Sequence, residues 1–92
     1  MMMRVEILCK KDELAKGHTV SRAIERAAQL CNIPVQITIT HNFVAFANSS
    51  FNPANTPAVF INNSLEFSGN EINLGILQKK LKELNSRAGQ QF

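Results

Sequence analysis

The chain has 92 residues, of which 45% are hydrophobic and 18% are charged, and its formal net charge is +3. This length suits one domain with one core, and the hydrophobic fraction excludes an intrinsically disordered chain. The mild positive charge is spread along the sequence, whereas a nucleic-acid-binding domain usually gathers its basic residues on one face. We therefore expect a single globular domain over residues 1–92, and a nucleic-acid partner is disfavoured.

The sequence carries no sign of a membrane or secretory protein. No apolar run approaches the roughly 20 residues that cross a bilayer. The segment from Met1 to Cys9 lacks the long apolar stretch and the small-residue cleavage site of a signal peptide. Two cysteines, Cys9 and Cys31, are too few for a disulfide framework. We expect a cytoplasmic protein with reduced thiols and no membrane partner.

The patterns in the first half of the chain predict a strand, a polar loop, a helix and a second strand. In chain order these elements cover residues 4–9, 10–18, 20–32 and 35–40. The helix is indicated by apolar residues at helical spacing, with Thr19 as its cap and Pro34 just beyond its end. The second strand alternates between apolar and polar residues, which indicates one buried and one wet face, as at the edge of a sheet.

The second half predicts a short weak helix, a loop, a β-hairpin and a final helix. In chain order they begin at His41, Asn52, Ala58 and Asn73. The hairpin consists of strands over residues 58–61 and 65–68 joined by an Asn-rich turn, because Asn tolerates positive φ. The final helix has an apolar stripe of leucines, and residues 86–92 are expected to form a flexible tail.

Together these elements predict an α/β fold of order β-α-β-α-β-β-α, with a mixed four-stranded sheet and helices on both faces. Three segments carry a resemblance to a known family: residues 4–32, Asn55-Thr56-Pro57, and residues 58–84. With these segments the chain resembles the thioredoxin-like fold. Within that fold it is most similar to the small glutaredoxin-sized proteins known as redox-active disulfide proteins.

One departure from this family bears directly on function. The family places a Cys-x-x-C motif between the first strand and the first helix. The corresponding position here is Glu13-Leu14-Ala15-Lys16 or Leu14-Ala15-Lys16-Gly17, and neither contains cysteine. The dithiol cycle needs one thiolate at the helix start and a second thiol that resolves the mixed disulfide. We therefore expect no dithiol oxidoreductase activity.

The resemblance also implies a candidate binding surface. In the family the proline before the third strand is cis, and the backbone beside it pairs with an extended peptide or with glutathione. Here this implies a cis Thr56–Pro57 bond. Our leading hypothesis is a non-catalytic binding module that uses Thr56 and Pro57 together with Lys10, Lys16 and His18 of the predicted loop. The partner would be a peptide or protein of unknown identity, and we expect no cofactor.

Two other functions remain open at this point. Cys9 could act as a lone redox thiol whose pKa is lowered by Lys10 and Lys11, although a small buried packing residue is the simpler interpretation. A small nucleic-acid-binding or protein-binding domain could instead use three lysines of the last helix, at positions 79, 80 and 82.

The remaining cysteine and the histidines carry weaker signals. Cys31 falls on the apolar face of the first helix, so core packing is expected, and the length of that helix should prevent a Cys9–Cys31 disulfide. His18 and His41 have no nearby Cys or carboxylate cluster, so we expect no metal site.

Overall fold

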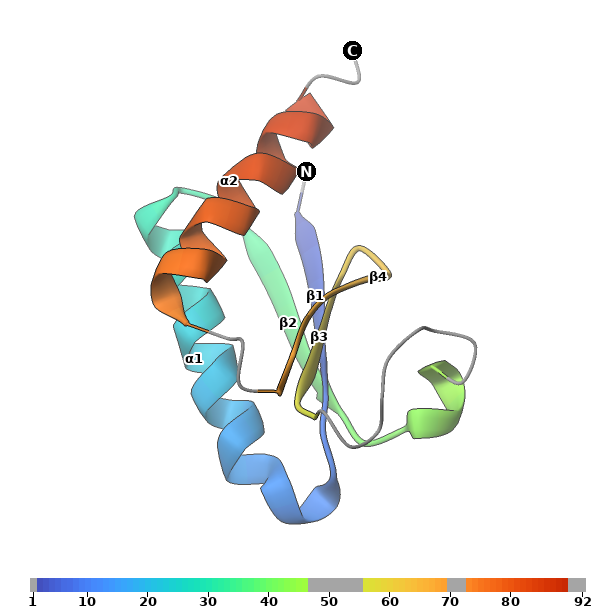
Figure 1. Ribbon diagram of the computed structural model, residues 1–92. Coiled ribbons are helices and arrows are strands. Elements are labelled where there is room, and N and C mark those ends of the chain that lie inside the picture. Colours follow the sequence, from blue (N-terminus) through green and yellow to red (C-terminus); the bar gives the residue numbers. More distant parts are fainter. Residues whose placement is uncertain (1, 47–55, 70–72, 90–92) are drawn as a thin grey trace.

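A computed structural model describes residues 2–46, 56–69 and 73–89 (Figure 1). The described chain contains four strands, two α-helices and two short 3-10 turns. Their bounds are β1 Met3–Leu8, η1 Lys11–Glu13, α1 Leu14–Leu30, β2 Val35–Thr40, η2 Phe43–Phe46, β3 Ala58–Ile61, β4 Ser64–Ser68 and α2 Leu74–Gly89. Neither α-helix is long and apolar enough to cross a membrane.

The strands form one mixed sheet in the order β2-β1-β3-β4. Strand β1 pairs in parallel with β2 and antiparallel with β3, and β3 pairs antiparallel with β4. The long connection through α1 allows the parallel pairing of β1 with β2, whereas a tight turn suffices for β3 and β4. The prediction of an α/β fold with a mixed four-stranded sheet is confirmed, as is the position of β2 at the sheet edge.

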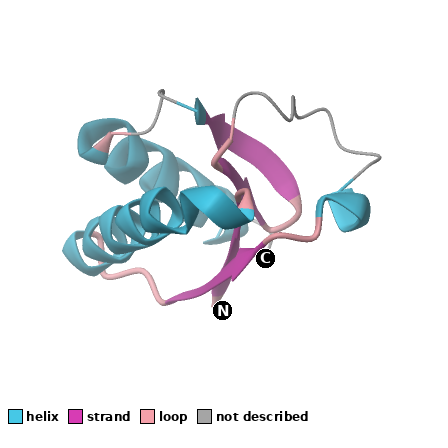
Figure 2. Cartoon of the chain, turned by 90° about the horizontal axis from the view of Figure 1, so that it is seen from below, coloured by secondary structure: helices cyan, strands magenta, loops and turns pink. Residues whose placement is uncertain are grey.

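The prediction of helices on both faces is wrong for the described residues. Figure 2 shows α1 and α2 on the same side of the sheet. Alternate side chains of the strands point to that side, and they form the main core together with residues of both helices. On the other face, Leu8, Ala58 and Phe60 pack against Phe43 and Phe46 of the short turn η2. The weak helix predicted over residues 41–51 is a single 3-10 turn, and residues 47–51 lie outside the described part.

Helix α1 begins at Leu14, six residues before the predicted start, so the predicted loop over residues 10–18 is helical from its fifth residue onward. The apolar pattern could not reveal this first part of the helix. Its contact with the sheet is made by Gly17, which is buried against Cys9 and has no side chain to produce a periodic signal. A helix start that packs through glycine looks polar and loop-like in the sequence.

The turns of the second half follow the predicted chemistry. Asn62 and Asn63 have φ values of 49° and 72°, as the hairpin requires. The Asn73 side chain caps α2, because its Oδ1 accepts a hydrogen bond of 3.0 Å from the Ile76 N–H. The predicted tail from Ser86 onward is wrong in part, since α2 continues to Gly89 and only residues 90–92 lie outside the described chain.

The packing of the main core predicts that one leucine of each helix contributes very differently to the free energy of unfolding. Leu77 of α2 is fully buried, whereas Leu30 of α1 is 57% exposed. We expect Leu77→Ala to lower the free energy of unfolding by about 2–5 kcal/mol, because it removes apolar contacts and leaves a cavity. Leu30→Ala is the matched control and should change it by less than about 0.5 kcal/mol. Urea titration followed by circular dichroism measures both, and equal losses would contradict the described packing.

Candidate functional site

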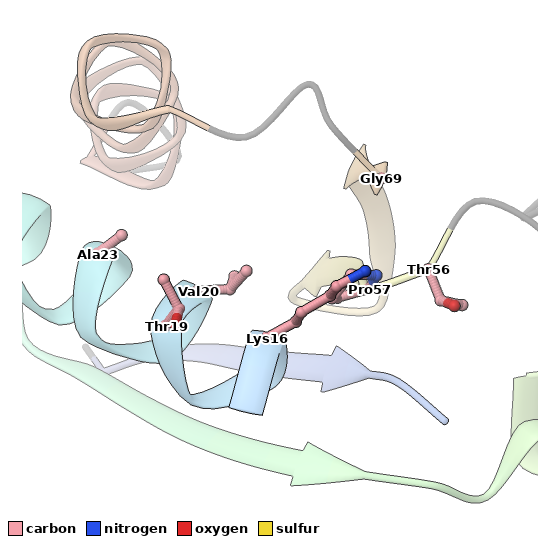
Figure 3. A pocket seen from close by; sticks show the side chains of 7 residues that line it. All are labelled: Lys16, Thr19, Val20, Ala23, Thr56, Pro57 and Gly69. Atoms are coloured by element: carbon pink, nitrogen blue, oxygen red, sulfur yellow. The ribbon is translucent and has the colours of Figure 1, made fainter. Parts of the chain in front are cut away.

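A pocket of about 320 Å³ lies between the first turns of α1 and the segment that enters β3. Figure 3 shows its lining residues, which come from α1, from the Thr56–Pro57 segment and from Gly69, the residue after β4. The lining residues are Lys16, Thr19, Val20, Ala23, Thr56, Pro57 and Gly69. The structure therefore brings three of the five predicted binding residues, Lys16, Thr56 and Pro57, to one site.

One wall of the pocket is a single stripe of α1. Lys16, Thr19, Val20 and Ala23 follow the spacing i, i+3, i+4 and i+7, so their side chains lie on one side of the helix. The Lys16 side chain extends across the pocket towards Pro57 (Figure 3). The Thr19 hydroxyl donates a hydrogen bond of 3.0 Å to the Ala15 carbonyl. The wall therefore combines one cation with a largely apolar surface.

The opposite wall is the segment that leads into β3. The Thr56–Pro57 peptide bond is cis, as the resemblance implies. The Pro57 carbonyl accepts a hydrogen bond of 2.9 Å from the Gly69 N–H, which fixes the end of β4 against this segment. Gly69 has a φ of 60°, a conformation that favours glycine. Among the described residues, no main-chain group forms a hydrogen bond with the N–H or C=O of Thr56.

Glu13, just before α1, contacts Thr56 and is a residue that the sequence patterns do not single out. Its carboxylate accepts a hydrogen bond of 2.8 Å from the Lys10 N–H and another from the Thr56 hydroxyl. Burial alone would raise the pKa of Glu13. The hydrogen bonds from Lys10 and Thr56 and the positive charges of Lys10 and Lys16 outweigh burial and hold the pKa below its ordinary value. The three-residue spacing of Lys10 and Glu13 at a helix start was the signal available in the sequence.

The other two predicted binding residues lie outside the pocket. His18 is exposed on α1, two positions from Lys16, and residues two apart do not share a helix face. Its selection followed from treating residues 10–18 as a loop. Lys10 is exposed before η1 and contributes its main-chain N–H to Glu13 rather than a side chain to the pocket.

Cys9 is a buried packing residue. It is fully buried beneath Gly17, and burial, followed by the negative charge of Glu13, raises the pKa of its thiol. This burial agrees with the simpler of the two interpretations, a packing residue, whereas a thiol activated by Lys10 and Lys11 would have a lowered pKa; both lysines are exposed to solvent while the thiol is not. The Cys9 Sγ lies 3.9 Å from His41 Nδ1, and that nitrogen is 2.8 Å from the Cys9 carbonyl oxygen.

Cys31 lies at the other end of α1 and packs against the main core, as predicted. Its Sγ is 3.9 Å from the carbonyl oxygen of Gln78 in α2. Both cysteines are free thiols, which confirms the prediction that they do not form a disulfide with each other. Helix α1 separates them.

Two observations bear on the other charged residues that the structure describes. Lys80 is paired with Glu66 of β4 at 3.1 Å, which removes one of the three lysines proposed for nucleic acid. Within residues 2–46, 56–69 and 73–89, no group of three or more His, Cys, Asp or Glu side chains is placed to hold a metal ion.

In comparisons with known proteins, the chain matches no protein-family model, no curated protein and no solved structure. What the pocket binds must therefore be inferred from its own geometry.

The contact of Gly17 with Cys9 predicts an unusual response to a glycine substitution. A Cβ at Gly17 would lie 2.9 Å from the Cys9 Sγ, closer than such atoms approach. We expect Gly17→Ala to destabilise the protein by about 1–2 kcal/mol, although alanine alone favours a helix by about 1 kcal/mol. In a Cys9→Ala background the same change should be neutral or stabilising. Urea unfolding of the four proteins measures this coupling, and a stabilising Gly17→Ala in both backgrounds would contradict it.

The hydrogen bonds of Glu13 predict a pH-dependent contribution to stability. Because the pKa of Glu13 is lower in the folded state, its ionised form stabilises the protein at pH values above the pKa of an unfolded glutamate. This stabilisation is lost as the pH falls through the lowered value. We expect Glu13→Gln to have a lower urea midpoint than the wild type at neutral pH, with the difference closing as the pH falls through the lowered pKa of Glu13.

Glu25→Gln, at an exposed position of α1, corrects for the general loss of an acidic side chain. If the Glu13→Gln difference stays constant from neutral to acid pH after that correction, the ionised Glu13 carboxylate does not stabilise the folded protein.

Proposed function

We propose that the chain is a non-catalytic thioredoxin-like module that binds an extended peptide segment in the pocket between α1 and Thr56–Pro57. The single observation that carries this proposal is the convergence of Lys16, Val20 and Pro57 on one pocket next to main-chain groups of Thr56.

The thioredoxin-like assignment is supported by three features. The sheet order β2-β1-β3-β4 with one parallel and two antiparallel pairings agrees with the resemblance. A long helix joins the two parallel strands, and the cis Thr56–Pro57 bond lies directly before β3. The departure is the sheet face opposite the helices, where the described residues contribute only the turn η2.

The start of α1 has no cysteine, which supports a non-catalytic role. A dithiol mechanism needs an accessible thiolate at the helix N-terminus, and the residues there are Glu13, Leu14, Ala15 and Lys16. The nearest thiol, Cys9, lies under the helix rather than at its exposed end, and its pKa is raised. The same burial disfavours the monothiol alternative, because an inaccessible protonated thiol is a poor nucleophile.

The size and chemistry of the pocket indicate the class of ligand. A volume of about 320 Å³ is near the lower end of ligand pockets, which suits a side chain or two rather than a large cofactor. Val20, Ala23 and Pro57 provide an apolar floor, while Lys16 favours a nearby carboxylate. The Thr56 N–H and C=O, which form no hydrogen bond with the main chain of the described residues, would supply a donor and an acceptor to an extended segment. An uncharged or acidic peptide with one small apolar side chain fits this set of groups.

A displayed library of random peptides provides the test, because it does not presuppose the ligand. Peptides recovered on the wild-type protein are measured by fluorescence anisotropy against Thr19→Arg and His18→Arg. Both positions are exposed on α1, but only Thr19 lines the pocket. We expect Thr19→Arg to weaken binding at least tenfold, about 1.4 kcal/mol, because the new side chain occupies the pocket. His18→Arg should leave the affinity within about twofold.

Circular dichroism of both variants shows whether the helix is retained. Equal affinities for the two folded variants would place the peptide elsewhere and refute the proposed pocket. Failure to recover any peptide on the wild-type protein would refute peptide binding itself.

A further inference from the structure

The outer edge of β2 carries a second inference, which does not depend on the pocket. In the part of the chain that the structure describes, β1 is the only strand paired with β2. Figure 2 shows β2, the strand that leads into η2, at the margin of the sheet with no described element beyond it. Helix α1 packs on the face of this strand and leaves the edge uncovered.

The parallel ladder determines which main-chain groups point outward. The carbonyls of Pro34 and Thr40 accept hydrogen bonds from the Met3 and Cys9 N–H groups. In a parallel pair the inward-pointing residues alternate, so positions 36 and 38 also face β1. The N–H and C=O groups of Val35, Ile37 and Ile39 therefore point away from the sheet, and no described residue pairs with them.

The side chains of β2 do not protect this edge from pairing with another strand. Natural proteins protect an open edge strand with charged residues, proline, a bulge or a very short length. The sequence Val-Gln-Ile-Thr-Ile-Thr has no charge and no proline, and its six residues pair with β1 in unbroken register. This is one of the longest strands of the sheet, and it is open at the position where protection is normally found.

We propose that β2 pairs antiparallel with β2 of a second copy of this chain, about a twofold axis at Ile37. With this axis, Val35 faces Ile39 of the partner and Ile37 faces its own counterpart. These are the outward-pointing residues, so each pair can exchange both main-chain hydrogen bonds, roughly six in all. The half-buried Val35, Ile37 and Ile39 side chains would cover one another on the helix side of the joined sheet.

The charges on the open face agree with this register. Arg4 of β1 lies beside Gln36, and Glu6 lies beside Thr38. Across the proposed axis Gln36 is opposite Thr38 of the partner. Four neighbouring side chains then form a row across the joined sheet, in the order Arg4, Gln36, the partner's Thr38 and the partner's Glu6. The row has a cation at one end, an anion at the other and two neutral polar residues between them. No like charges meet at the contact, which favours a second copy over an unrelated charged partner.

The test compares two double variants that differ only in the charge at position 36. In Gln36→Lys/Thr38→Lys, the lysine at position 36 of each copy lies opposite the lysine at position 38 of the other copy, so two pairs of like charges meet across the axis. Gln36→Glu/Thr38→Lys places opposite charges there instead and continues the alternation from Arg4 to Glu6. Ser64→Lys, on the edge strand β4, introduces a lysine at the other edge of the sheet as a control.

Sedimentation equilibrium from about 10 μM to about 1 mM covers the range expected for a contact of this size. We expect the wild type and Ser64→Lys to dimerise with similar constants. Gln36→Lys/Thr38→Lys should raise the dissociation constant at least tenfold, and Gln36→Glu/Thr38→Lys should return it to within about threefold of the wild type. A wild type that stays monomeric, or a lysine pair that leaves dimerisation unchanged, overturns the proposal.

Amide hydrogen exchange provides a second readout that identifies the edge. The Val35, Ile37 and Ile39 amides should become protected as the protein concentration rises, whereas the Gln36 and Thr38 amides, already bonded to β1, should not change. Protection that rises only on β4 would assign the dimer to the other edge and overturn the proposal. The two readouts also report on folding, because a variant with lost β1–β2 pairing loses protection at positions 36 and 38.

Discussion

Strand β1 is hydrogen-bonded on both sides, and its core residues are buried from both faces of the sheet. Val5, Ile7 and Leu8 have no exposed surface, and the first two face the helices while Leu8 faces the turn η2. The parallel partner β2 and the antiparallel partner β3 are both aligned on this strand. The position of α1 follows, because the chain must leave the end of β1 and return to start β2 beside it. The pocket and the open sheet edge both depend on this central strand.

The contact between Cys9 and Gly17 links β1 to the site. Cys9 ends the central strand, and only a residue without a side chain allows α1 to pass directly over it. This close approach lets the helix begin at Leu14, six residues before its predicted start at Val20. The early start places Lys16 on a helix rather than in a loop, and it places Thr19 inside the helix rather than at its cap. Glu13, directly before that helix start, is hydrogen-bonded by the Thr56 hydroxyl.

The elements with a strong apolar period could be predicted from the sequence, and those defined by a missing side chain could not. The alternation in β2 and the Asn turn between β3 and β4 are both found where the sequence predicts them. The start of α1 was missed because Gly17 contributes contact without hydrophobicity. In the described part of the chain the second sheet face carries no α-helix; there Phe43 and Phe46 of a 3-10 turn pack against Leu8, Ala58 and Phe60.

The residues of the candidate site likewise divide into those that the sequence reveals and those that it does not. Lys16, Thr56 and Pro57 were found through the resemblance, which compares position along the chain and does not need the helix boundary. His18 lies outside the pocket, because the direction of its side chain depends on where the helix begins. Glu13 was missed because its role arises from a hydrogen bond to Thr56, a residue far away in the sequence. Contacts of this kind become visible only when the chain is folded.

The central claim is that an extended segment lies along Thr56 and across the stripe of α1. Intermolecular nuclear Overhauser effects between an isotope-labelled protein and an unlabelled bound peptide test it most directly. The account predicts contacts from the peptide to the Val20 methyl groups and to the Thr56 amide, with none to the exposed Lys79 of α2. Contacts confined to α2, or to the Gln36 and Thr38 face of the sheet, would contradict it.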